Sequence, residues 1–137
     1  MQEYGVEVLR VPTGYWNWID TKDAGPNAPE EIASRIANLA NMASPDDYKV
    51  HIDSLFSWAK KYDIKVLLDL HGAPGSQNSE IHSGCVVNSD DGGPVKPEHY
   101  FDTTWNMQLA LEAIEVMAAR CAEAGDVCFG VQVLNEP

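Results

Sequence analysis

The residues with the clearest chemical potential are Asn135 and Glu136, which follow a short apolar run and precede Pro137. The run from Phe129 to Leu134 is typical of a parallel strand that is buried on both faces. Ligands of parallel α/β folds bind at the carboxyl ends of the strands, so a carboxylate and an amide at this point are candidates for catalysis. A solvated glutamate after a strand is the alternative, because a tripeptide is a weak signal.

A second polar pair lies near the end of another predicted strand, which spans residues 64–70. Side chains alternate between the two faces of a strand. Val66, Leu68 and Leu70 therefore share one face, and Asp69 and His71 lie on the other. In a barrel this second face points toward the axis, so we expect Asp69 and His71 to point inward together.

The first predicted strand runs from Gly5 to Pro12 and carries one basic residue, Arg10. Its valines and leucine favour a buried strand, and Pro12 and Gly14 are expected to end it. A guanidinium within such a run needs a carboxylate partner, which indicates either an ion pair near a polar site or a structural salt bridge.

Aromatic side chains are concentrated in the loop after this strand. Tyr15, Trp16 and Trp18 lie within four residues of one another. Flat rings beside the carboxyl end of a strand suit stacking against a sugar or a base. Core packing by at least one of the two tryptophans is the alternative interpretation.

The segments between these strands have helical patterns. Residues 30–42 predict a modest helix, and Ser44 with Pro45 is a strong start for a second helix, because serine caps and proline at the first position are favoured. The apolar face of this second helix is expected to contain Tyr48, Ile52, Leu55, Ala59 and Tyr62. A third helix is predicted from Thr103 or Thr104 to about Ala122. Residues 72–93 are expected to form a long loop that contains His82. The alternation of strands and helices predicts an α/β fold with a parallel sheet and right-handed crossovers.

Composition narrows the possible partners. The 137 residues fit one domain, 45% of them are hydrophobic, and no apolar run is long enough to cross a bilayer. A formal net charge of -12 without a basic cluster argues against nucleic acid and anionic membrane surfaces. No spacing indicates a metal site. Cys121 and Cys128 are expected to be buried thiols, and Cys85 to lie in a loop, free or paired.

Three motifs, taken together, resemble a known family. They are Arg10 with VPTGYW at residues 11–16, LDLHGAPGSQN at residues 68–78, and LNEP at residues 134–137. In this order and across almost the whole chain they resemble glycoside hydrolase family 5, and most closely its exo-β-1,3-glucanase branch.

The resemblance implies a retaining glycosidase on a (β/α)₈ TIM barrel, with the three strands corresponding to the second, third and fourth of the full barrel. It implies Glu136 as general acid/base, Asn135 as the amide that contacts the sugar 2-hydroxyl, His71 as a sugar ligand and Arg10 as the positioner of the nucleophile. Tyr15, Trp16, Asn78 and His82 are expected to bind substrate. The substrate would be a β-glucan or an oligosaccharide, and no cofactor is expected.

Residues 1–137 are therefore expected to be one partial catalytic domain, incomplete at both ends. A whole barrel takes about 250 residues, and the family's second carboxylate comes from a strand further downstream. The chain alone is expected to be inactive and to self-associate through open sheet edges. No secretory signal is visible in these residues, although the resemblance implies an extracellular or cell-wall location for the parent.

The chain also departs from the family pattern. Ser79, Glu80, Ile81 and His82 stand where relatives often have glycine, an aromatic residue and asparagine. The resemblance to the family therefore does not extend to the subsites beyond the cleavage point. Two alternatives remain: a β-1,4- or β-1,6-glucanase on the same barrel, and a non-catalytic sugar-binding remnant.

Overall fold

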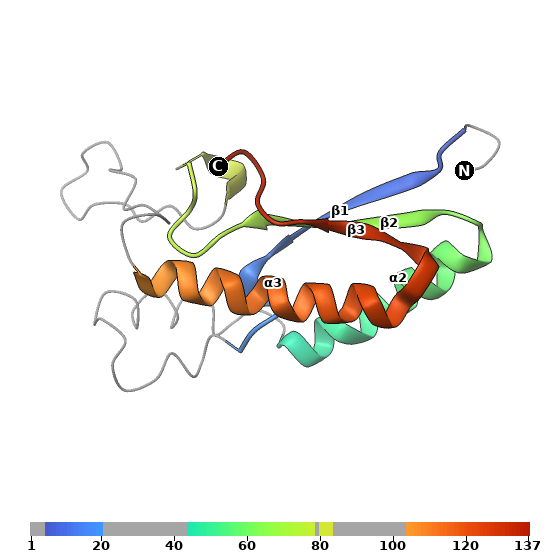
Figure 1. The fold of residues 1–137 in the computed structure, drawn as a ribbon, viewed down its shortest axis with the longest axis horizontal. Coiled ribbons are helices and arrows are strands. Elements are labelled where there is room, and N and C mark those ends of the chain that lie inside the picture. Colours follow the sequence, from blue (N-terminus) through green and yellow to red (C-terminus); the bar gives the residue numbers. More distant parts are fainter. Residues whose placement is uncertain (1–4, 21–43, 79, 84–103) are drawn as a thin grey trace.

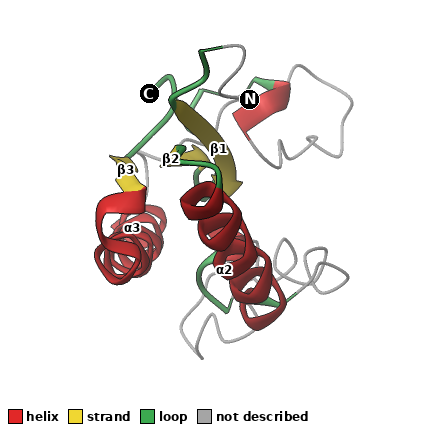
Figure 2. Cartoon of the chain, turned by 90° about the vertical axis from the view of Figure 1, so that its right-hand side faces the viewer, coloured by secondary structure: helices red, strands yellow, loops and turns green. Residues whose placement is uncertain are grey.

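A computed structural model describes residues 5–20, 44–78, 80–83 and 104–137. In this part of the chain three parallel strands pair in chain order, and two helices cover one face of the sheet (Figures 1 and 2). The elements are β1 (Val8–Gly14), η2 (Tyr15–Asn17), α2 (Pro45–Lys61), β2 (Lys65–Gly72), η4 (Ile81–Ser83), α3 (Thr104–Ala124), η6 (Gly125–Val127) and β3 (Cys128–Gln132). The predicted helix over residues 30–42 and Cys85 lie outside the described residues.

β2 is the central strand, and its two faces differ as its sequence predicts. Val66, Leu68 and Leu70 are fully buried and pack with α2 and α3 in the core. Asp69 and His71 share the opposite face and contact each other. This alternation separates an apolar layer beneath the helices from a polar layer on the other side of the sheet.

β1 begins and ends later than the sequence predicts. It spans Val8–Gly14, so Pro12 lies within the strand, opposite Asp69, and the expected end at Pro12 is wrong. Among the described strands β1 pairs only with β2, and a proline that lacks an N–H is tolerated in such an edge strand. The two extra residues carry β1 to the level at which β2 ends, since Gly14 pairs with Gly72.

α2 starts as predicted. Ser44 caps it by accepting a hydrogen bond from Asp47 N at 3.3 Å, and Asp47 Oδ2 accepts one from Ser44 N at 3.1 Å. Ile52 and Ala59 are buried as expected, but Tyr62 is 54% exposed, and Phe56, which was not among the residues predicted for this face, is buried. Tyr62 is the C-terminal cap, with φ -104° and ψ 11°, so its side chain no longer follows the helical face.

Replacing Ser44 with alanine should lower the free energy of unfolding by about 1 kcal/mol, because the amide of Asp47 loses its acceptor at the helix start. Ser57 is exposed in the middle of the same helix and offers a matched control. Ser57→Ala should change the stability by less than about 0.5 kcal/mol. Chemical unfolding curves followed by circular dichroism measure both values, and equal effects of the two substitutions would contradict the capping role.

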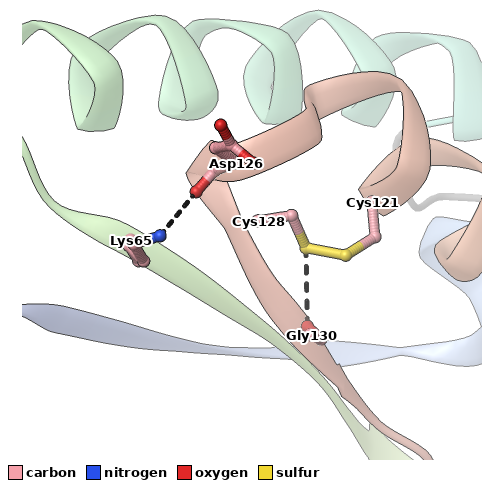
Figure 3. The surroundings of a disulfide bond; sticks show 5 residues. All are labelled: Lys65, Cys121, Asp126, Cys128 and Gly130. Carbon is pink, nitrogen blue, oxygen red and sulfur yellow. Dashed lines mark hydrogen bonds between the residues drawn. A yellow bond between two sulfur atoms is a disulfide. The ribbon is translucent and has the colours of Figure 1, made fainter.

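α3 and β3 are joined by a disulfide that the sequence pattern does not predict. Cys121 in α3 and Cys128 in β3 are bonded, with their Cα atoms 5.2 Å apart (Figure 3). The expectation of two buried thiols is therefore wrong. The η6 turn folds the chain back between the two residues and brings their Cα atoms into the range that a disulfide requires. Lys65 Nζ donates to Asp126 O at 3.0 Å and holds this turn against β2 (Figure 3).

Candidate active site

Side chains from all three strands meet on the polar face of the sheet. Arg10 from β1 and His71 from β2 both contact Asp69 Oδ2, with Arg10 Nη2 and His71 Nδ1 each 2.8 Å away. Arg10 Nη2 also donates to Asn135 Oδ1 at 2.6 Å. Three of the four predicted catalytic residues, Arg10, His71 and Asn135, are thus brought together.

Asp69 is the residue that joins them. Its side chain is fully buried, and its Oδ1 atom has no hydrogen-bond partner among the described residues. A buried carboxylate is tolerated where cations and hydrogen bonds face it, which Arg10 and His71 supply. The period-two pattern of β2 placed Asp69 beside His71, but the predicted site did not include Asp69.

The contact with Asp69 also fixes the orientation of His71. If the neutral imidazole carries its hydrogen on Nδ1, it donates to the carboxylate and leaves Nε2 as an acceptor. Such a nitrogen can accept a hydrogen bond from a sugar hydroxyl. The geometry therefore suits the predicted role of His71 as a ligand of substrate.

Arg10 makes one more contact, from Nε to Gln132 Oε1 at 2.9 Å. Its guanidinium thus bonds to Asp69, Gln132 and Asn135, and 42% of its side chain remains exposed. The carboxylate partner expected for Arg10 is therefore present within the sheet itself. Its role toward a nucleophile stays a prediction.

The side chain of Gln77 forms hydrogen bonds to the backbone near the ends of β2 and β3. It is buried, and its Nε2 donates to the backbone oxygens of His71 and Asn135, both at 2.8 Å. Its Oε1 accepts from Ala73 N at 3.1 Å. The side-chain amide thereby replaces sheet hydrogen bonds at the point where the strands separate. Gln77 lies inside the long motif that carried the family resemblance, but the predicted site omitted it.

Gln77→Glu should destabilise the protein by about 2–4 kcal/mol, because a carboxylate would face two carbonyl oxygens that now accept hydrogen bonds. Gln108 is exposed on α3, so Gln108→Glu makes the same chemical change away from the site. That control should stay within about 0.5 kcal/mol of the parent. Urea unfolding at neutral pH measures both stabilities. A Gln77→Glu protein as stable as its control would show that the hydrogen bonds of the Gln77 side chain are not needed for stability.

Glu136 lies beside this cluster with a second set of contacts. Its backbone oxygen accepts from Asn78 Nδ2 at 2.9 Å, and its Oε2 atom is 2.8 Å from His82 Nε2. Its φ of 42° is a left-handed conformation, which is unfavourable for a residue with a side chain and is common at functional sites. The side chain is 66% exposed, so Glu136 is accessible to a ligand.

The aromatic residues of η2 divide between the site and the core. Trp18 is buried and donates from Nε1 to Thr13 Oγ1 at 2.8 Å, so it is the core tryptophan that the alternative interpretation required. Tyr15 and Trp16 are half-buried, and their rings contact each other edge to face, with 5.2 Å between the ring centroids.

Two glycines make room for the Trp16 ring. A Cβ atom at Gly14 would lie 2.3 Å from it, and one at Gly72 would lie 2.9 Å away. The indole therefore packs directly on the paired ends of β1 and β2. A ring in this position can contribute to the wall of a sugar site.

Two further observations concern metal ions and membranes. Among the described residues, no cluster of three histidine, cysteine, aspartate or glutamate side chains could hold a metal ion. The helices of the same part of the chain are too short or too polar to span a bilayer.

Comparison with known proteins identifies relatives of the chain. Glucan 1,3-beta-glucosidase 2 of Wickerhamomyces anomalus is 32% identical over 135 residues, which are 97% of this chain and 25% of that protein. Glucan 1,3-beta-glucosidase of Schwanniomyces occidentalis is 30% identical over 139 residues, covering 100% of this chain and 26% of the relative. The chain thus spans about a quarter of the length of these relatives. No protein-family model matches it.

Solved structures support the fold. The chain superposes on the crystal structure of AoRut with a TM-score of 0.55 and 18% identity, covering 98% of this chain and 31% of the other. For the rutinosidase from Aspergillus niger the TM-score is 0.54 and the identity 20%, with coverages of 97% and 30%. Together with the parallel strand order, this likeness confirms the predicted α/β fold, part of a (β/α)₈ barrel. By sequence, the chain is a homologue of the glucan 1,3-beta-glucosidases and corresponds to about a quarter of their length.

Proposed function

We propose that the whole protein is a β-glucan hydrolase that cleaves β-1,3-linked glucose from the non-reducing end and retains the anomeric configuration. The observation that carries this proposal is the polar cluster on one face of the sheet, where Arg10 of β1 and Asp69 of β2 meet His71 and Asn135 near the carboxyl ends of β2 and β3, next to an accessible Glu136. The relatives named glucan 1,3-beta-glucosidase support the substrate class.

Residues 1–137 would form one part of a single catalytic barrel in that protein. Active sites of (β/α)₈ barrels lie at the carboxyl ends of the strands, which is where His71, Asn135 and Glu136 are found. The remaining strands would complete the site and close the sheet edges of β1 and β3.

Glu136 would act as the general acid/base. Retaining hydrolysis needs two carboxyl groups about 5–5.5 Å apart, one to protonate the leaving oxygen and one to attack the anomeric carbon. Glu136 is exposed and can meet the leaving oxygen. Asp69 is not placed to be the second group, because it is fully buried and already bonded to Arg10 and His71. The nucleophile would come from another strand of the barrel.

Asn135 and His71 would hold the sugar. Asn135 is buried, and its Oδ1 accepts from Arg10, which leaves its Nδ2 donor for the 2-hydroxyl group. Hydrogen bonds to that hydroxyl strengthen in the transition state of glycoside hydrolysis. Tyr15, Trp16 and the exposed part of Asn78 would line the approach.

The test is hydrolysis by the complete protein of laminari-, cello- and gentio-oligosaccharides, with products followed by chromatography and proton NMR. We expect glucose released from laminari-oligosaccharides, with the β-anomer formed first. Preferential cleavage of the β-1,4-linked or β-1,6-linked oligosaccharides would show that the protein is specific for that linkage and not for β-1,3. Binding without any cleavage would favour a sugar-binding protein instead.

A further inference from the structure

His82 contacts the carboxylate proposed to carry out acid/base catalysis. Its Nε2 is 2.8 Å from Glu136 Oε2, and 42% of its side chain is exposed. Its ring also lies 5.5 Å from the ring of His71, measured between centroids. The residue belongs to the segment in which this chain departs from the pattern of the family it resembles. The sequence predicted only a substrate contact for it.

Within the part of the chain that the structure describes, the carboxylate of Glu136 has few contacts that could hold it. Asn78 fixes the backbone oxygen of Glu136, but within the described residues His82 is the one side chain that contacts its carboxylate. An exposed carboxylate loses rotational freedom when it is held in one orientation, and a catalytic acid that is misplaced by about 1 Å loses much of its rate. A fixed orientation therefore has direct value for catalysis.

We propose that His82 is a positioning residue for the acid/base step, one that donates a hydrogen bond from Nε2 to Glu136 Oε2 and leaves Oε1 to exchange the proton. This inference rests on the proposed function. In the first step, the proton on Oε1 passes to the glycosidic oxygen as the bond from that oxygen to the anomeric carbon breaks and the nucleophilic carboxylate bonds to that carbon. In the second step, Oε1 takes a proton from water as the water oxygen displaces the carboxylate.

The donor from His82 is compatible with both protonation states of Glu136. An ionised carboxylate accepts a hydrogen bond at either oxygen, and a carboxyl protonated on Oε1 still accepts one at Oε2. The contact therefore does not need to break during the catalytic cycle. Its requirement is that the imidazole carries a hydrogen on Nε2, which the neutral ring can do in one tautomer.

Two substitutions separate the donor from the ring. His82→Phe keeps an aromatic ring near His71 but removes the donor, and His82→Gln keeps an N–H donor at a similar reach without a ring. His51 is exposed on α2, so His51→Phe and His51→Gln are matched controls away from the site. All four variants are to be made in the complete protein, with kcat and KM measured on laminaribiose and on 2,4-dinitrophenyl β-glucoside.

We expect His82→Phe to lower both kcat and kcat/KM on laminaribiose by about 10- to 100-fold, the effect of losing one charge-assisted hydrogen bond. On the dinitrophenyl substrate the loss of kcat/KM, which reports the step in which the leaving group departs, should be about threefold or less, because that leaving group needs little protonation. His82→Gln should restore most of the laminaribiose activity, and both His51 variants should behave as the parent.

Other outcomes would overturn the proposed role. Equal losses on the two substrates would assign His82 a structural role in η4, and a raised KM with unchanged kcat would make it a substrate contact. An active parent that is insensitive to His82→Phe would remove His82 from the acid/base step and leave the proposed function intact. A parent that cleaves none of the glucosides would overturn the proposed function, and the role of His82 with it.

Discussion

Glu136→Gln should lower the turnover of unactivated β-glucan by about 10²- to 10⁴-fold, since proton transfer to the leaving oxygen contributes a factor of this size. Glutamine keeps the shape of the side chain and can still meet His82, but it has no acidic proton to give. Aryl glucosides with good leaving groups should lose far less in the glycosylation step. Comparing kcat/KM on laminari-oligosaccharides and on a dinitrophenyl glucoside measures the difference.

Glu112 offers the control for this prediction. It is exposed on α3, so Glu112→Gln makes the same chemical change at a position remote from the polar face of the sheet. Its kinetics should match those of the parent on both substrates. If Glu136→Gln lost activity equally on the two substrate classes, Glu136 would not be the acid.

Arg10→Lys should lower kcat/KM by about 10- to 100-fold and move the pH–rate profile, although it keeps the positive charge. The guanidinium bonds from two different nitrogens to Gln132, Asn135 and Asp69. A single ammonium group cannot reproduce this planar geometry, so Asn135 loses the contact that orients its amide. The positive charge also changes position, which alters the electrostatic field at nearby titrating groups and moves the pH–rate profile. Activity measured across the pH range tests both effects.

Arg120 provides a comparison, because it is also an arginine paired with carboxylates, in this case Asp53 and Glu123, but on the helical side of the sheet. Arg120→Lys should leave the pH–rate profile unchanged. For Arg10→Lys we expect at most about 1 kcal/mol of lost stability, since its side chain is partly exposed. An unchanged pH profile combined with a lower Tm would make Arg10 a structural residue.

The sequence predicted best those features that depend on local pattern. The alternation in β2 correctly placed Val66, Leu68 and Leu70 in the core and Asp69 beside His71, because a strand has a fixed period of two. The start of α2 at Ser44 followed from capping, which involves only the next three residues. The short motifs pointed to relatives that the comparisons then found.

Features that depend on contacts distant in sequence were harder to predict. Gln77 bonds to Asn135, 58 residues away, and no local pattern distinguishes it from a solvated loop glutamine. The sequence predicts that β1 ends at Pro12, because a proline is tolerated within a strand only at an edge, and the place of β1 at an edge of the described sheet depends on how the strands assemble. Tyr62 is exposed because α2 ends at Lys61, and end positions are the least certain part of a periodic pattern. Phe56 lies within the helix, four residues after Ile52 and three before Ala59, a spacing that places it on the same face as both.

The bond between Cys121 and Cys128 has a practical consequence for anyone who prepares this protein. In the cytosol of an expression host, glutathione and thioredoxin keep thiols reduced, so the disulfide would be absent from protein made there. On a chain-entropy estimate, a loop this short contributes about 2.5 kcal/mol when it is closed. Cytosolic preparations should therefore yield a looser junction between α3 and β3, and an oxidising route of production is the appropriate choice for every measurement described above.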